Sequence, residues 1–281
     1  MDDGSTDESW RVITSFGAAI RAGRQINQGP IITRNRLLEL SRGEWIQFLD
    51  ADDEVAADKL ELQMARRHSA EILYGSMRLE WFEGQNPVRR REHRAEAQPD
   101  AWAGWFRWKY PNPSACLFRQ DWLRRVNGWD PDYYVCEDYA LLRRLFFAGA
   151  RAAATPEAWS VYRQWSVNQL VNKHAVALAE TRLHLMLETA KRLAVQDRFN
   201  EERRQAFQNA AFLIVRNLYK ISPGTGVEAW TRLRNEAPRF DPSPACAPAA
   251  YRFLYRWFGF TAAEKVAGWR RQICSTAVSK A

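Results

Sequence analysis

The sequence predicts an α/β sheet domain over residues 1–170 and a mostly helical region over residues 171–281. In the first part, short β-prone runs alternate with helical patterns, which is typical of an α/β sheet. After about residue 170, apolar residues recur at helical spacing almost to the end of the chain. With 281 residues, of which 46% are hydrophobic, the chain is long enough to bury a substantial core.

The expected elements of the first part alternate along the chain. The β-prone runs are residues 19–26, 45–49 and 70–82, and the helical patterns are residues 33–43 and 57–68. A turn is expected at Asn127 and Gly128. A later helix is expected to open at Glu137 and Asp138 and to stop at Gly149, because glycine commonly follows the last helical turn.

The helical region is interrupted at residues 222–226 (SPGTG) and at the proline-rich residues 240–248. Residues 251–271 mix aromatic side chains with arginines; a terminal helical pair packed on the domain is one interpretation, and an interfacial membrane anchor is the other. In residues 98–114, aromatic side chains recur at helical spacing, which favours a stripe buried in the core. The alternative is a platform for a sugar, because the faces of Trp and Tyr rings suit sugar rings. Trp105 in that stripe and Trp129 are the candidates for acceptor contact.

The charge composition limits the classes of partner. The chain has a net charge of +8 and a pI near 9.5, but its basic residues are spread out, and the tight run at residues 89–91 is expected to be a solvated turn. No signature of a DNA- or RNA-binding motif accompanies them, so we expect no nucleic-acid partner. Anionic small molecules or an anionic membrane surface fit better.

The sequence also bears on the cellular compartment. No stretch approaches the roughly 18–20 consecutive apolar residues of a membrane-spanning helix, and the N-terminus has neither the basic nor the apolar region of a signal peptide. The 4 cysteines are scattered without paired spacing, so we expect reduced thiols. We therefore expect a cytoplasmic protein, which the membrane interpretation of residues 251–271 would place at the inner face of the membrane.

The most informative motif follows the strand expected at residues 45–49. Asp50, Ala51, Asp52 and Asp53 come directly after it, and open α/β sheets bind ligands at the carboxyl ends of their strands. One of these carboxylates could cap the next helix. Several carboxylates so close together repel each other unless a hard cation such as Mg²⁺ or Mn²⁺ is shared with a substrate's phosphates. Because Ala51 points away, Asp50 and Asp52 can face the same side.

Glu137 and Asp138 open the later helix after an aromatic and acidic loop. Carboxylates in a first helical turn commonly serve only as partners of the helix dipole. A carboxylate held there could equally act as a general base, fixed in orientation, ionised at neutral pH and aimed at a cleft.

The sequence resembles glycosyltransferase family 2, whose members have the GT-A fold, over residues 1 to about 170. The resemblance is carried by the order and spacing of MDDGSTDES, NQGPIITRN, GEWIQFLDADDE, NPSACLFRQDWLRRVNGWDPDYYVCEDYALLRRL and VYRQWSVNQ. No one of these motifs would suffice alone. Together they imply a Rossmann-like sheet that binds a nucleotide sugar.

The resemblance implies several contacts to the nucleotide. Asp3, with Asp2 beside it, resembles the acidic pair of which one member hydrogen-bonds the base. Arg34 resembles the basic residue that closes over the nucleotide. Arg163 lies where relatives carry a motif flanking the diphosphate, and Trp165 stands where many of them have histidine.

The other implied roles concern the metal and the reaction. Asp50, Ala51 and Asp52 resemble the DXD motif, with Asp50 toward the ribose and the metal, and Asp52 on a Mn²⁺ or Mg²⁺ ion and the diphosphate. Asp138 resembles the base that deprotonates the acceptor hydroxyl, and Glu137 is the next candidate. With no second carboxylate placed as a nucleophile, we expect a single displacement that inverts the sugar carbon.

These motifs imply a metal-dependent, inverting glycosyltransferase that moves a sugar from a nucleoside diphosphate sugar, UDP-linked, to a hydroxyl of a glycan or lipid-linked acceptor, as in cell-envelope polysaccharide synthesis. An inactive relative with a scaffolding role is one alternative, and a basic membrane- or nucleic-acid-binding module is another. Family members carry a strand and a helix before the DDGS segment, so we also expect a native product longer by about one βα unit.

Overall fold

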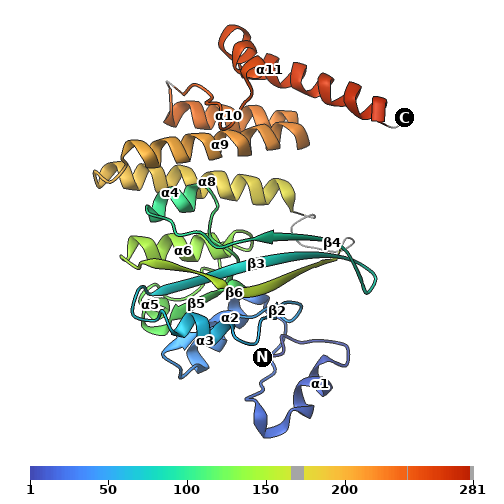
Figure 1. The fold of residues 1–281 in the computed structure, drawn as a ribbon, viewed down its shortest axis with the longest axis vertical. Coiled ribbons are helices and arrows are strands. Elements are labelled where there is room, and N and C mark those ends of the chain that lie inside the picture. The colour runs from blue at the N-terminus through green and yellow to red at the C-terminus, as the bar shows by residue number, and fades with distance from the viewer. Residues whose placement is uncertain (166–173, 239, 279–281) are drawn as a thin grey trace. The chain divides into compact units, whose positions relative to one another are not determined.

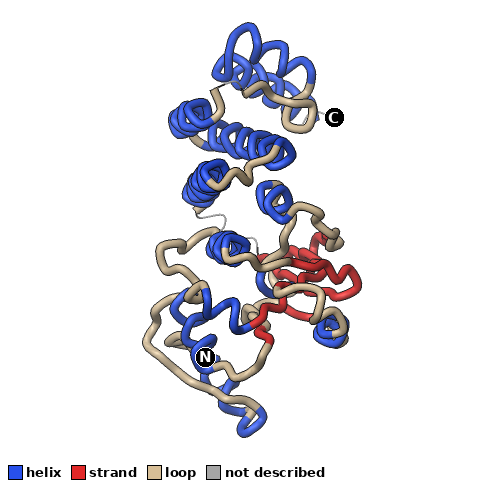
Figure 2. Tube along the Cα trace, turned by 90° about the vertical axis from the view of Figure 1, so that its left-hand side faces the viewer, coloured by secondary structure: helices blue, strands red, loops and turns tan. Residues whose placement is uncertain are grey.

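The computed structural model describes residues 1–165, 174–238 and 240–278. They form two compact units, one made of Met1–Ala101 and Tyr110–Gln169, the other of Trp102–Lys109 and Leu170–Ala281. The strands of the described residues lie in the first unit and the second is helical, as the colours of Figure 2 show. The predicted fold class is therefore confirmed. The predicted boundary at residue 170 lies outside the described residues.

The first unit is built on a mixed sheet with the strand order β1, β5, β3, β6, β2, in which β4 also pairs with β3. The strands are β1 (Trp45–Ile46), β2 (Glu54–Val55), β3 (Ile72–Glu83), β4 (Asn86–His93), β5 (Cys116–Arg119) and β6 (Ala152–Trp165). β3 runs parallel to β6 and antiparallel to β4 and β5. Figure 1 shows β3 and β6 as the long central strands.

Several helices accompany this sheet. They are α1 (Ser9–Ser15), α2 (Pro30–Leu40), α3 (Lys59–Met64), α5 (Gln120–Arg125) and α6 (Glu137–Phe147), with short 3-10 turns η1 (Gly17–Ala19) and η2 (Pro113–Ala115). The helices expected from the sequence in the regions of α2, α3 and α6 are confirmed. Gly149 follows α6 with φ of 98°, a backbone conformation that favours glycine.

Three local predictions are wrong in part. Residues 19–26 form no strand, and only a single bridge joins Arg24 to Asp2. The strand expected over residues 45–49 stops at Ile46, because its backbone pairing with β5 covers only Trp45 and Ile46. Residues 89–91 lie in β4 rather than in a turn; every residue of this strand is exposed, and charge on an exposed strand opposes unwanted pairing.

An aromatic chain fixes α6 on the sheet. The ring of Tyr74 in β3 and the ring of Phe146 in α6 both lie 5.2 Å from the ring of Tyr110. The hydroxyl of Tyr139, also in α6, donates a hydrogen bond to the backbone carbonyl of Tyr110 at 3.2 Å. The first turn of α6, which carries Glu137, is thereby held rigidly in the unit.

The second unit consists of α4 (Ala101–Phe106), α8 (Ala175–Val195), α9 (Glu201–Ile221), α10 (Pro223–Glu236) and α11 (Ala249–Val278). Its core is centred on Phe212 of α9, whose ring contacts those of Trp230, Phe240, Tyr251, Tyr255 and Phe260. No helix in the described part of the chain has the length and apolar character to cross a membrane.

The predicted interruptions of the helical region are present with one difference. The SPGTG motif separates α9 from α10 only at Ser222, because Pro223 occupies the first helical position and the rest of the motif forms the first turn of α10. Residues 240–248 lie between α10 and α11. The three cysteines with described side chains are buried and outside any disulfide, as expected for reduced thiols; the side chain of Cys274 lies outside the described part.

A close approach of α10 to α9 depends on Gly226. A Cβ at this position would lie 2.3 Å from the Cα of Tyr219, whereas a Cβ at Gly224 in the same helix would have no neighbour within 4 Å. Gly226→Ala should therefore lower the free energy of unfolding by about 1–3 kcal/mol, because the helices must separate to admit the methyl group. Urea unfolding followed by circular dichroism measures the change.

Gly224→Ala is the matched control. It should be neutral or stabilising by up to about 1 kcal/mol, since alanine is the better helix former and no atom obstructs it. Equal effects of the two substitutions would contradict the close packing of α9 and α10.

Candidate active site

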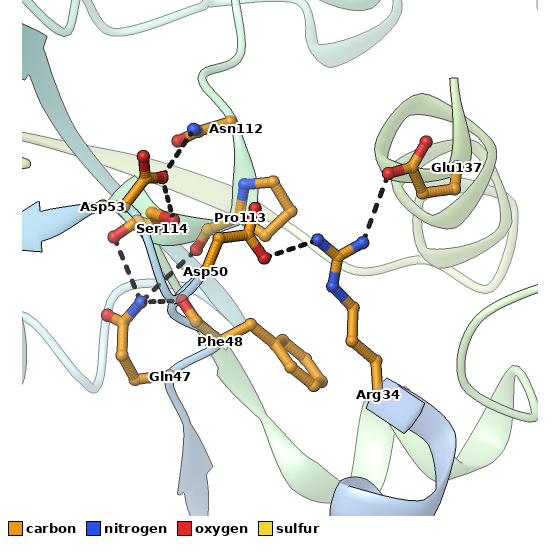
Figure 3. A network of polar contacts seen from close by, with 9 residues as sticks. All are labelled: Arg34, Gln47, Phe48, Asp50, Asp53, Asn112, Pro113, Ser114 and Glu137. Carbon is orange, nitrogen blue, oxygen red and sulfur yellow. Dashed lines mark hydrogen bonds and ion pairs between the residues drawn. The ribbon is translucent and has the colours of Figure 1, made fainter. Parts of the chain in front are cut away.

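The acidic loop after β1 contains one buried carboxylate, Asp53, which is 7% exposed. Its Oδ2 accepts hydrogen bonds from the Ser114 hydroxyl at 2.6 Å and from Asn112 Nδ2 at 3.4 Å (Figure 3). Its Oδ1 accepts one from the backbone N–H of Arg163 at 3.3 Å. Asp53 therefore ties the acidic loop to η2 and to β6.

Negative charge is concentrated at this loop. Burial raises the pKa of Asp53 to about 6, hydrogen bonds from Ser114 and Arg163 oppose the rise, and the charges of Asp50 and Asp52 add to it. Asp50 is half-buried, and Asp52 is exposed, as is Ala51 between them. The loop thus uses one carboxylate as an anchor and presents Asp52 to solvent.

Arg34 of α2 connects this loop to the first turn of α6. Its guanidinium lies 2.6 Å from Asp50 Oδ1 and 3.2 Å from Glu137 Oε1, as Figure 3 shows. The side chain of Arg34 is only 12% exposed. Burial alone would lower the pKa of Arg34, but the two carboxylates raise it above its ordinary value. The structure therefore brings together three residues that the sequence places far apart.

The ring of Trp129 supports the Arg34 guanidinium, whose carbon lies 4.8 Å from the ring centroid. The neighbouring Asn35 holds the backbone of Trp129: its Nδ2 donates to the Trp129 carbonyl at 2.8 Å, and its Oδ1 accepts from the Trp129 backbone N–H at 2.7 Å. Gly128 is required beside it, because φ is 63° and a Cβ there would lie 2.4 Å from Asn35 Oδ1. The Arg34 guanidinium is thus held by the carboxylates of Asp50 and Glu137 and covered on one face by the Trp129 ring.

Asp138 lies beside Glu137 in the first turn of α6 and is half-buried. Burial raises its pKa to about 7, and the Glu137 carboxylate adds to the rise while Arg34 opposes it. Asp138 therefore releases its proton at a higher pH than an ordinary aspartic acid does. A pKa near the working pH is the value that suits a general base.

Asp2 and Asp3 are engaged within the protein. Asp2 is 3% exposed and lies 2.9 Å from the guanidinium of Arg24. Asp3 accepts hydrogen bonds from the backbone N–H groups of Gln28 at 2.9 Å and Gly29 at 2.8 Å, directly before α2. Burial tends to raise the pKa of Asp3, but these hydrogen bonds lower it overall. Asp3 thus fixes the start of the helix that carries Arg34.

The remaining candidates are dispersed. Arg163 of β6 pairs with Glu54 of β2, and the neighbouring ring of Trp165 stacks on Phe82 with centroids 5.4 Å apart. Trp129 and Trp105 are each 1% exposed, and Trp105 belongs to the second unit. Neither ring offers a face to an acceptor in this structure.

The residues present fit a divalent cation bound mainly through a substrate. In the described residues, no group of three or more His, Cys, Asp or Glu side chains is arranged to hold a metal. Mg²⁺ is, however, often bound by one or two carboxylates together with phosphates and water. The exposed carboxylate of Asp52 is of this chemical kind.

The sequence did not predict the buried polar residues that support the acidic loop. Lys59 is 0% exposed, and its ammonium donates to Gln63 Oε1 at 2.8 Å and to Gln47 Oε1. Gln47 in turn donates to the Ser114 carbonyl at 3.1 Å. Asn112 and Ser114, which precede β5, hydrogen-bond Asp53. They lie 59 and 61 residues after Asp53 in the sequence, so this contact leaves no local pattern there.

The N-terminal part of the chain matches a known family. Residues 1–125 match the model described as "Glycosyl transferase family 2". An uncharacterized glycosyltransferase of Haemophilus influenzae is 42% identical over 71 residues, covering 23% of this chain and 27% of that protein. The uncharacterized glycosyltransferase YibD of Escherichia coli is 30% identical over 84 residues, covering 29% of this chain and 24% of that protein. The matches span about a quarter of the length of these relatives.

Solved structures show a weaker likeness. TarS of S. aureus, residues 1–349 in complex with UDP-GlcNAc, has a TM-score of 0.48 and 13% identity, covering 85% of this chain and 81% of that chain. The same fragment in complex with UDP has a TM-score of 0.44 and 13% identity. The match to family 2 confirms the resemblance for residues 1–125, and Glu137, Asp138 and Arg163 lie beyond it.

Asp138→Asn should flatten the pH dependence of stability between about pH 4 and pH 7. The folded pKa of about 7 lies above the ordinary value of 3.8. Between these values the folded state keeps a proton that the unfolded state has released, so wild type should lose stability as the pH rises through this window. Urea unfolding at a series of pH values measures the slope.

The control is Asp132→Asn, which removes an exposed carboxyl group in the loop before α6. It should leave the slope as in wild type. A slope that is the same for wild type and Asp138→Asn would show that the Asp138 carboxyl is not desolvated.

Proposed function

We propose that the glycosyltransferase family 2 domain carried by residues 1–125 makes this chain a nucleotide-sugar glycosyltransferase. The observation that carries the proposal is the contact of Arg34 with both Asp50 and Glu137. Through this contact, one side chain joins two elements: the loop expected to bind the donor, and the first turn of α6, which is expected to hold the base. A transferase needs both together, because the donor carbon and the acceptor oxygen must meet in one geometry.

The proposed donor is a nucleoside diphosphate sugar with UDP as its nucleotide. The guanidinium of Arg34 is planar, nearly buried and held by carboxylates, and a diphosphate is the other anion that such a group binds well. Asp2 and Asp3 are proposed for the base, Asp50 for the ribose, and Arg163 for the diphosphate side. Their internal contacts give these residues fixed positions before the donor arrives.

Asp52, with Asp50 beside it, is the proposed holder of Mn²⁺ or Mg²⁺. Such an ion, when bound, would stabilise the negative charge that develops on the leaving diphosphate. Asp53 is assigned a supporting role, since both its oxygens are already occupied by hydrogen bonds.

The two carboxylates at the start of α6 are proposed to have different roles. Glu137 is engaged by Arg34 and so serves the donor side as a positioning residue. The Asp138 carboxylate accepts the N–H of Tyr139 at 2.8 Å, and its pKa of about 7 lets it take a proton from an acceptor hydroxyl at neutral pH. One base acting in a single displacement would invert the configuration of the sugar carbon.

The proposed acceptor is a hydroxyl of a glycan or of a lipid-linked saccharide, and the proposed setting is the cytoplasm and the assembly of cell-envelope polysaccharide. Contact of residues 251–271 with a membrane is part of this proposal, because it would bring the enzyme to an acceptor held in lipid. Reduced, buried cysteines are compatible with that compartment.

Asp52→Ala should remove most of the Mn²⁺-dependent binding of UDP and leave the fold intact, because an exposed loop carboxylate contributes little to the core. Isothermal titration of UDP with and without Mn²⁺ measures the effect. Asp58→Ala, which removes another exposed carboxylate of the same region, should bind UDP as wild type does. Unchanged metal-dependent binding by Asp52→Ala would remove the metal assignment.

Asp138→Asn and Glu137→Gln should fail in different ways. Loss of a positioned general base lowers turnover by about a hundred to ten thousand fold and hardly changes donor affinity. Loss of the Glu137 charge should instead weaken UDP binding, because Arg34 loses a partner, with a smaller effect on turnover. Release of UDP from a panel of UDP-sugars, combined with UDP titration, separates the two constants. Near-normal turnover by Asp138→Asn would move the base to another residue.

A further inference from the structure

The helix α11 has two apolar faces, of which only one is buried in its own unit. The buried face consists of Tyr251, Tyr255, Phe260 and Ala263, none more than 8% exposed. Three other aromatic side chains of this helix, Phe253, Trp257 and Phe258, are 59%, 73% and 66% exposed. We call these three exposed side chains the aromatic ridge. Large aromatic side chains so exposed and so close in sequence commonly mark a binding surface.

The ridge is a defined structure. The rings of Phe253 and Trp257, one helical turn apart, lie with their centroids 6.2 Å from each other. Gly259 follows directly with φ of 79° and ψ of 178°, so the helix is broken there. The buried contacts of Tyr251, Tyr255 and Phe260 with the ring of Phe212 fix the chain on both sides of the break. The ridge is therefore held outward by the core of its unit.

The charge around the ridge is mainly positive. Among the charged side chains described between residues 249 and 269, Arg256 and Lys265 are exposed and Arg252 is half-buried. Glu264 is 1% exposed and lies 2.5 Å from Arg216, so it adds no charge to the surface. Asp241, outside this stretch, pairs with Arg256. Basic side chains thus outnumber acidic ones beside the ridge: Arg256 is paired with the exposed Asp241, while Lys265 and Arg252 add positive charge.

We propose that the aromatic ridge, Phe253, Trp257 and Phe258, inserts into the headgroup region of an anionic membrane, with Lys265 on the lipid phosphates. The proposal deepens the membrane contact named in the proposed function and rests on that function for its purpose, which is access to a lipid-linked acceptor. Trp and Phe on a helix with basic neighbours are the composition that binds the membrane interface.

A second copy of this chain is the less suitable occupant of the ridge. An aromatic side chain buries at most about 250 Å², and a stable protein interface needs roughly 800 Å² on each partner. Three side chains fall short of that area. Shallow insertion into lipid needs no matching protein surface, because hydrocarbon and headgroups adapt to the inserted rings.

The test is co-sedimentation of the full chain with vesicles of phosphatidylglycerol and phosphatidylcholine, and with vesicles of phosphatidylcholine alone. Wild type should bind the anionic vesicles, and added salt should weaken the binding. The double variant W257S/F258S should lower the partition coefficient by roughly tenfold or more. Val195→Ser is the matched control, since Val195 is 89% exposed in the same unit, and it should bind as wild type does.

Circular dichroism and size-exclusion chromatography establish that both variants are folded, and the more conservative pair W257F/F258W should retain binding. Equal vesicle binding by W257S/F258S and wild type overturns the proposal, as does equal binding of wild type to neutral and anionic vesicles. Concentration-dependent self-association that W257S/F258S abolishes, without vesicle binding, assigns the ridge to a second copy and also overturns it. Sugar transfer is not a readout, so failure of this test leaves the proposed activity standing.

Discussion

The arrangement of the candidate site depends on the ion pairs of Arg34. A guanidinium that is 12% exposed must be compensated by charge, because an unpaired buried charge destabilises a protein by several kcal/mol. Asp50 and Glu137 provide that compensation from two separate elements, and Trp129 covers the face of the group. The requirement to pair one charge thus holds the acidic loop, α2 and the start of α6 in a fixed relation.

The buried Lys59 beside the acidic loop is hydrogen-bonded to neutral amide groups. Burial lowers the pKa of Lys59 to about 8, and its ammonium donates to the amide oxygens of Gln47 and Gln63. Gln63 also donates to the Ala115 carbonyl at 3.0 Å, next to the serine that holds Asp53. A network in which each buried group has a partner is rigid. The supporting layer therefore keeps Asp53 in place, while Asp50 pairs with Arg34 and Asp52 stays exposed.

The helical unit contains two groups of aromatic residues, one buried and one exposed. Those around Phe212 form its core, and the Arg216–Glu264 pair lies beside them. Those of the aromatic ridge face solvent although they belong to the same helix, α11. The break at Gly259 lets both arrangements coexist in one stretch of sequence, since it changes the direction of the chain between Phe258 and Phe260. In the proposed function, the sheet unit carries out the chemistry and the helical unit contacts lipid.

The sequence by itself determined the α/β class, the helices α2, α3 and α6, the strand β3 and the helical character of the second unit. These follow from local periodicity and from residues such as Gly149, which act within a turn of the chain. It also predicted which carboxylates gather after β1. Tertiary structure alone decided that Asp53 is an anchor, that Glu137 belongs to Arg34, and that the pKa of Asp138 is near 7. It alone separated the buried Trp105 and Trp129 from the exposed Trp257. Burial and pairing across the fold join residues by long-range contacts, which leave no periodic signal in a single sequence.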